Sequence, residues 1–120
     1  MGFPIYRPRR MRASENLRSM IRETEISVKD LIYPVFVVPG KNIKHEIESL
    51  PGNYHWSVDR VLECIDEVVK LGIPSIILFG LPSYKNAIGS SAWDMEEPVQ
   101  QACMLIKSKY PELVITTDVC

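Results

Sequence analysis

The chain has 120 residues, of which 46% are apolar and 24% are charged, and its net charge is −1. This size and composition exclude an intrinsically disordered chain and are typical of one soluble globular domain. No apolar run approaches the ~20 residues that a membrane helix needs, and the opening residues lack a signal-peptide core, so we expect a cytoplasmic protein without a membrane partner.

The charge is divided unevenly along the chain. Residues 1–22 contain six arginines and one glutamate, whereas residues 23–120 contain eight basic and fourteen acidic groups. Residues 1–13 hold too few apolar groups to bury by themselves, which predicts an extended arm. Ser14 can cap a short helix that continues to about Glu25, because the apolar residues that follow it recur at helical spacing.

The basic arm admits two kinds of partner. Clusters of arginine can track phosphates or anionic lipid, or they can contact a neighbouring subunit. No aromatic platform or nucleic-acid-binding motif accompanies these arginines, and the remainder of the chain is acidic. We therefore predict a contact with a neighbouring subunit and no nucleic-acid partner. The arm with its helix, residues 1–26, is expected to be separate from residues 27–120.

The segment after the arm predicts a buried strand. Ser27 and Asp30 are spaced like a capping box, which predicts one helical turn. Residues 31–38 then form a continuous apolar run rich in β-branched and aromatic residues, as in a strand buried on both faces. Pro34 within this run indicates a bulge or an edge position, because proline has no amide hydrogen to donate. A polar stretch follows to Tyr54.

A helix and a second strand are predicted next. Ser57 is the expected N-cap of an amphipathic helix, and Gly72 stands just past its end as a C-cap. Residues 75–80 form a second apolar strand that ends on glycine, and a polar loop follows. Pro98 suits the first turn of another helix, where a missing amide hydrogen is no loss. Residues 113–119 then form a third strand.

Strands that alternate with helices, and that are apolar throughout, are typical of a parallel α/β sheet. Three such units match the first part of a (β/α)8 TIM barrel, which needs eight units and typically ~250 residues. Half of an open doubly wound sheet is the alternative. The first strand-to-helix connection lacks a glycine-rich phosphate turn, which favours the barrel.

Asp118 and Cys120 stand at the carboxyl end of the third predicted strand, the edge where both barrels and open sheets place their active sites. Two residues apart on a strand, both side chains point to the same face and can reach one ligand or metal. The alternatives are helix capping for Asp118 and a structural thiol for Cys120. One cysteine does not make a zinc site, since zinc needs three or four ligands.

The remaining residues with chemical potential have structural interpretations. His45 and His55 flank a loop and lack a third ligand nearby, so we expect surface histidines. Cys64 and Cys103 fall within predicted helices, where packing or partial exposure explains them. Trp56 and Trp93 precede helices and are interpreted as hydrophobic staples or lids.

Three separated motifs resemble the porphobilinogen synthase (delta-aminolevulinic acid dehydratase) family. Residues 7–12 followed by residues 30–37 are similar to the family's opening. Residues 78–82, with Lys85 and then Gly89-Ser90, are similar to the loop after its second barrel strand, and residues 111–120 resemble its third strand running into a metal loop. Two residues depart from the family pattern: Asn86 stands where aspartate is usual, and Glu97 where glycine is common.

The resemblance implies a (β/α)8 barrel whose long amino-terminal arm wraps a neighbouring subunit of a homo-octamer. It implies an enzyme that joins two molecules of 5-aminolevulinate into porphobilinogen, with loss of two waters, in heme biosynthesis. The family forms Schiff bases to its substrate with two lysines that come later than Cys120, so we expect this chain to be an inactive amino-terminal fragment. A non-catalytic oligomerisation or regulatory module is the alternative.

Only two site residues carry over from the family by position. Asp118 matches the active-site carboxylate, and Cys120 matches the first ligand of a three-cysteine zinc site. The family's magnesium-dependent members hold another residue at the cysteine position, so Cys120 favours the zinc-dependent type, with an allosteric magnesium also expected in the longer enzyme. Because a short parallel sheet leaves edges and apolar faces uncovered, we expect the isolated chain to fold weakly or to aggregate.

Overall fold

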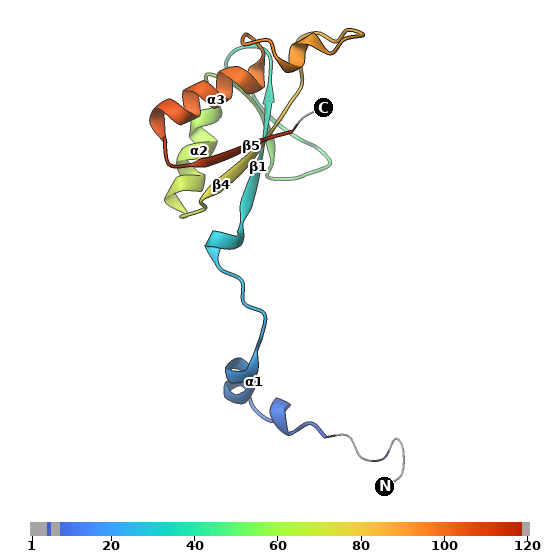
Figure 1. The fold of residues 1–120 in the computed structure, drawn as a ribbon, viewed down its shortest axis with the longest axis vertical. Helices are drawn as coiled ribbons and strands as arrows, with labels where there is room; N and C mark the ends of the chain where they lie inside the picture. Colours follow the sequence, from blue (N-terminus) through green and yellow to red (C-terminus); the bar gives the residue numbers. More distant parts are fainter. Residues whose placement is uncertain (1–4, 6–7, 119–120) are drawn as a thin grey trace.

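The computed structural model describes Ile5 and residues 8–118. The chain forms one five-stranded sheet, two helices that pack on it, and an amino-terminal segment that runs away from it (Figure 1). The strands, in sequence order, are β1 (Ile32–Val38), β2 (Lys44–Glu46), β3 (Tyr54–Ser57), β4 (Ser75–Gly80) and β5 (Val114–Thr117). The α-helices are α1 (Glu15–Ile21), α2 (Val61–Lys70) and α3 (Pro98–Lys109).

The three predicted strands are confirmed as β1, β4 and β5, which pair as parallel neighbours. The sheet nevertheless contains five strands in the order β2-β3-β1-β4-β5, so the predicted count of three is wrong. The missed pair is the antiparallel hairpin of β2 and β3, in which β3 also pairs in parallel with β1. The residues of β2 are Lys-His-Glu and all are exposed, so the sequence has no alternation of apolar and polar residues from which this strand could be predicted.

Helix α2 begins later than predicted. Ser57 ends β3 instead of capping the helix, and its hydroxyl oxygen accepts a hydrogen bond from the Ile43 amide at 2.9 Å. The helix starts at Val61, after a turn closed by the Arg60 amide donating to the Ser57 carbonyl. The end of the helix is confirmed, because Gly72 follows it with a φ of +80°, a conformation that favours glycine.

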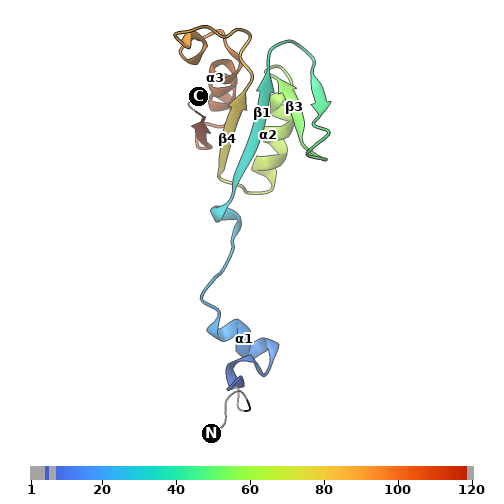
Figure 2. The same cartoon turned by 90° about the vertical axis from the view of Figure 1, so that its right-hand side faces the viewer.

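Helix α3 begins as predicted, with Pro98 in its first turn. Figures 1 and 2 show α2 and α3 on the same side of the sheet. The core lies between these helices and the sheet. Its fully buried side chains come from both layers: Val35, Val37, Ile76 and Leu78 from the strands, and Val61, Ile65 and Ile106 from the helices.

The opposite face of the sheet carries no helix within the described residues. Side chains alternate between the faces of a strand, so the register places the neighbours of the buried residues on this face. Phe36 and Phe79 stack there with ring centroids 5.6 Å apart. Ile32 and Val114 belong to the same face and are 57% and 56% exposed. The sheet is therefore apolar on both sides and covered on one.

The sequence predicted a bulge or an edge position at Pro34, and both are wrong, because Pro34 lies in the central strand β1 where pairing with β4 is continuous. The carbonyl of Val37 accepts a hydrogen bond from Leu81, which follows β4, so the odd-numbered residues of β1 direct their backbone groups toward β4. Pro34 therefore directs its nitrogen toward β3, which pairs with β1 only from Phe36 onward. Its missing amide hydrogen has no ladder partner to lose.

The amino-terminal segment contains a short helix, as predicted. The Ser14 side chain caps α1 by accepting a hydrogen bond from the Leu17 amide at 3.1 Å. The helix ends at Ile21, before the predicted Glu25, because Arg22 has an extended backbone. Ser27 and Asp30 form the predicted capping box around one 3-10 turn. Figure 2 shows α1 apart from the sheet, and the division of the chain at residue 26 stays a prediction.

Candidate functional site

The carboxyl ends of β1, β4 and β5 meet at one edge of the sheet, because the three strands are parallel neighbours. Asp118 directly follows β5 at this edge, where its amide donates to the Leu78 carbonyl at 3.3 Å. Its side chain is exposed. The carboxylate therefore follows the last strand, at the edge expected from the sequence, and its role in an active site stays a prediction.

The strand register assigns Asp118 to the face without helices. Leu78 is buried under the helices and pairs with Thr117, so Thr117 lies on the helix side. Thr116 and Asp118, on either side of it, belong to the opposite face, which they share with Phe36 and Phe79. In a barrel this face is the interior, and its carboxyl end opens into the active site.

Cys120 lies outside the described residues, so its predicted position beside Asp118 stays a prediction. Among residues 8–118, no group of three or more histidine, cysteine, aspartate or glutamate side chains is arranged to hold a metal. Zinc requires three or four ligands. The described residues therefore do not make up a zinc site by themselves.

The predicted surface histidines face one another across the β2–β3 hairpin. His45 is exposed, as expected, and pairs directly with His55. His55 is half-buried, with its ring edge-on to Phe36 at a centroid distance of 6.2 Å. Two imidazoles fall short of a zinc ligand set.

The two tryptophans have different surroundings. Trp56 is part of β3 and is buried in the core, so its interpretation as a helix staple is wrong. The two errors are connected, because the helix was predicted to begin at Ser57, directly after Trp56, whereas both residues belong to β3. Trp93 is 64% exposed in the loop before α3.

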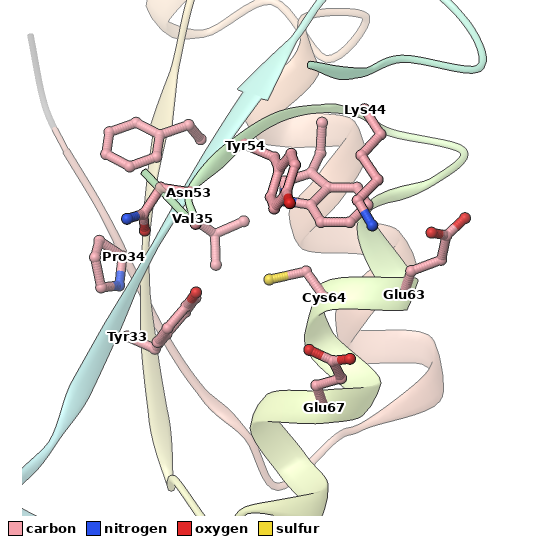
Figure 3. Close-up of a pocket in the computed structure, with 12 residues that line it drawn as sticks. Tyr33, Pro34, Val35, Lys44, Asn53, Tyr54, Glu63, Cys64 and Glu67 are labelled. Atoms are coloured by element: carbon pink, nitrogen blue, oxygen red, sulfur yellow. The ribbon is translucent and has the colours of Figure 1, made fainter. Parts of the chain in front are cut away.

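A cavity of about 130 Å³ lies between the sheet and α2 (Figure 3). Strand residues such as Tyr33 and Tyr54 line it on one side, and Cys64 and Glu67 of α2 on the other. The Lys44 ammonium lies over the Tyr54 ring, 4.8 Å from its centroid. These residues lie on the helix-covered face, whereas Asp118 belongs to the opposite face, so the cavity and the carboxylate are separate features.

The thiol in this cavity is unsuited to nucleophilic chemistry. Burial, and to a smaller extent the negative charge of Glu67, raise the pKa of Cys64 from 9.0 to about 11. A thiol with such a pKa carries almost no thiolate near neutral pH, and the thiolate is the reactive form. The packing role that the sequence predicted for Cys64 is confirmed by its burial.

One buried carboxylate was missed by reasoning from the sequence. Glu97 directly precedes α3 and is only 4% exposed. Its carboxylate accepts hydrogen bonds from the amide of Ser83, at 2.7 Å, and from the hydroxyl of the same residue. The sequence signal was its departure from the family's glycine, which by itself gives no partner.

The described features define an α/β protein with a mostly parallel sheet, helices on one face and a carboxylate at the carboxyl edge of the other. The family model for delta-aminolevulinic acid dehydratase matches residues 5–120. The chain belongs to the delta-aminolevulinic acid dehydratase family.

Relatives of that name cover almost the whole chain. The delta-aminolevulinic acid dehydratase of Synechococcus elongatus is 48% identical over 98% of this chain and 36% of the relative, and that of Ruminiclostridium josui is 47% identical over 97% of this chain and 57% of the relative. The Bacillus subtilis protein is 41% identical over the whole chain and 37% of its own length. The chain thus spans about a third of the length of most of these relatives.

The fold is also similar to a solved structure. The Toxoplasma gondii ME49 delta-aminolevulinic acid dehydratase (porphobilinogen synthase), in complex with the reaction product porphobilinogen, superposes with a TM-score of 0.86 at 28% identity. The match covers 97% of this chain and 34% of the Toxoplasma chain. Within the described part of this chain, no helix has the length and apolar character required to cross a membrane.

Proposed function

We propose that the protein to which these residues belong is a porphobilinogen synthase, which joins two molecules of 5-aminolevulinate into porphobilinogen with loss of two waters. The observation that carries the proposal is the match of residues 5–120 to the family, together with the likeness to a structure that holds porphobilinogen. The exposed carboxylate of Asp118, at the carboxyl edge of a parallel sheet, supports it.

In this proposal the five-stranded sheet is part of a TIM barrel, and Asp118 opens into the barrel mouth. A carboxylate there can pair with the amino group of 5-aminolevulinate and hold a proton during the condensation. We further propose that Cys120 is one thiolate ligand of a zinc ion whose other ligands lie outside these residues. Zinc in such a site supplies Lewis acidity toward a substrate oxygen. An allosteric magnesium and a cytoplasmic location stay predictions.

The proposal is tested in a protein of the relatives' full length that contains these residues. Asp118→Asn keeps the size of the side chain and removes its charge, so porphobilinogen formation is expected to fall by a factor of 10² or more. Thr116→Val changes a neighbour on the same face without removing a charge and serves as the control. Activity of the Asp118→Asn protein equal to that of the unchanged protein would contradict the assigned role.

Zinc content tests the role of Cys120 separately. Cys120→Ser is expected to lower the zinc bound per subunit, whereas Cys103→Ser, on the half-exposed side of α3, is expected to leave it unchanged. Equal zinc content in the two variants would contradict the assignment. The 120-residue chain alone is expected to form no porphobilinogen, because the family's Schiff-base lysines come later than Cys120, and measurable turnover would refute this.

We also propose that the arginine-rich arm contacts a neighbouring subunit in a homo-octamer. The arm supports this by its charge and by its exposed apolar side chains, such as Met20 and Ile26, which are 81% and 82% exposed. Residues 23–120 carry an excess of acidic groups, so the two parts attract one another between subunits. An arm of this kind also suits the alternative function, a non-catalytic module for oligomerisation.

Assembly is tested by reversing charge in the arm of the full-length protein. Replacing Arg9, Arg10 and Arg12 by glutamate is expected to shift the oligomer to smaller species in light scattering coupled to size exclusion. The control replaces three lysines outside the arm by glutamate, which makes the same change in charge and is expected to preserve the oligomer. These lysines are Lys41, Lys70 and Lys85. For the alternative function, failure of the 120-residue chain to co-assemble with full-length subunits would count against it.

A further inference from the structure

Glu97 is a charged side chain in an unusual environment. Among the described residues it is the one buried side chain that carries a formal charge, at 4% exposure. Burying a carboxylate costs free energy unless hydrogen bonds compensate for the lost water. Both carboxylate oxygens are compensated by the same partner, since Oε2 accepts from the Ser83 amide at 2.7 Å and Oε1 accepts from the Ser83 hydroxyl.

The backbone of Glu97 is held in place by the start of α3. Its amide donates to the Asp94 carbonyl at 3.2 Å, and its carbonyl accepts from the Gln101 amide at 3.0 Å. The side chain does not cap its own helix, although it stands at the N-cap position. It extends instead to Ser83, while its negative charge stays close to the positive end of the helix dipole.

This interaction joins the two ends of the loop between β4 and α3. Ser83 and Glu97 are 14 residues apart, and the residues between them include the exposed side chains of Ile88 and Trp93. The hydrogen bonds of Tyr84, Asn86 and Ser90 are made within the loop. The glutamine side chains of α3 bind only the far half of the loop, residues 91–96. They donate hydrogen bonds to the carbonyls of Ser91, Ala92 and Met95.

We propose that Glu97 is a latch that holds the loop of residues 83–96 closed at the carboxyl edge of the sheet. Among the described residues, the hydrogen bonds of the near half of the loop, residues 83–90, reach beyond the loop only at this carboxylate. Loss of the carboxylate frees that half of the loop, while the core beneath α3 remains packed. The latch is a property of the fold and does not depend on the reaction proposed above.

Lys85 provides a direct readout, because it is the one basic residue between Ser83 and Glu97. Trypsin is expected to cleave after Lys85 faster when the near half of the loop opens, because a protease binds an extended segment, whereas cleavage after Lys107 is expected to require the unfolding of α3. The ratio of the two cleavage rates, measured by mass spectrometry on a protein of the relatives' full length that contains these residues, isolates loop opening from global unfolding.

Glu97→Ala is expected to raise this ratio on the order of tenfold, because hydrogen bonds to a charged group are lost. Ser83→Ala removes the hydroxyl and keeps the amide, so its effect is expected to be smaller. Adding Ser83→Ala to Glu97→Ala is expected to change nothing further, since the two residues act as one pair. Glu96→Ala is the matched control, because it removes the adjacent exposed carboxylate, and it is expected to leave the ratio unchanged.

Two results would overturn the latch. One is a ratio in Glu97→Ala equal to that of the unchanged chain, whatever the absolute rates, which would mean that the loop opens only with the whole molecule. The other is an equal increase in Glu96→Ala and Glu97→Ala, which would mean that any lost carboxylate loosens the loop. Ser83→Ala is informative even if Glu97→Ala misfolds, because Ser83 is exposed and its replacement leaves the core intact.

Discussion

Cys64 shows how position alone changes the chemistry of a residue. Its thiol lies between the sheet and α2, and burial raises its pKa to about 11. The pKa of Tyr33 on the facing strand is also raised, first by burial and then by the charges of Cys64 and Glu67. Both groups keep their protons in the folded chain at pH values where the unfolded chain releases them. The stability that Cys64 contributes is therefore present below about pH 9 and is lost as the pH rises toward 11, and the contribution of Tyr33 is lost at pH values above its ordinary pKa of 10.0.

We predict that iodoacetamide labels Cys64 in the native chain at pH 8 about 100-fold more slowly than in the denatured chain, because the thiolate fraction falls tenfold for each unit of pKa. Peptide mass spectrometry measures the two rates. Cys103 is an internal control, since it is half-exposed in the same chain and is expected to react faster. Native labelling of Cys64 at the denatured rate would show that the thiol is not buried.

Helix α3 approaches β4 closely because Gly80 has no side chain. A Cβ atom at Gly80 would collide with the side chain of Val99, and it would also meet Val37 at 3.5 Å. The backbone of Gly80 is not in the left-handed region, so the restriction is one of space. The glycine that ends this strand therefore determines how α3 packs near the carboxyl edge.

We predict that Gly80→Ala destabilises the chain by about 1–3 kcal/mol, the usual cost of overpacking. Thermal unfolding measures this as a fall in Tm of several degrees. Adding Val99→Ala removes the colliding group, so the double variant is expected to recover part of the loss relative to Val99→Ala alone. Gly52→Ala is unsuitable as a control because of its positive φ. Independent effects of the two substitutions would contradict the packing explanation.

The whole molecule has two sheet edges with different protection. The β2 edge carries Lys44, His45 and Glu46, and such charged residues hinder pairing with another chain. The β5 edge carries Val-Ile-Thr-Thr and no charge. It also borders the helix-free face with the exposed side chains of Ile32 and Val114, so self-association is expected at β5.

We predict that Val114→Lys reduces aggregation of the 120-residue chain at micromolar concentration, because it introduces a charge on both the free edge and the uncovered face. Light scattering at fixed concentration measures the effect. Ser108→Lys makes the same change in charge on the exposed surface of α3 and is expected to have little effect. A similar reduction by both variants would indicate that net charge, not the β5 edge, controls association.

The sequence by itself determined the elements that depend on local pattern. Continuous apolar runs identified β1, β4 and β5, and Pro98 and Gly72 marked one helix start and one helix end, because these signals depend on neighbouring residues alone. The motifs that resemble the family were also local, and they led to Asp118 at the end of β5. The position of Cys120 beside it stays a prediction.

Only the tertiary structure decided the features that join distant residues. The hairpin of β2 and β3 forms by pairing a strand with no apolar residue, and that pairing draws Ser57 into the sheet and delays the start of α2. Glu97 is buried because Ser83, 14 residues away, satisfies its charge. The face assigned to Asp118 follows from the register of three strands. Pairing energy and burial depend on partners that no local window contains, which is why the sequence did not reveal them.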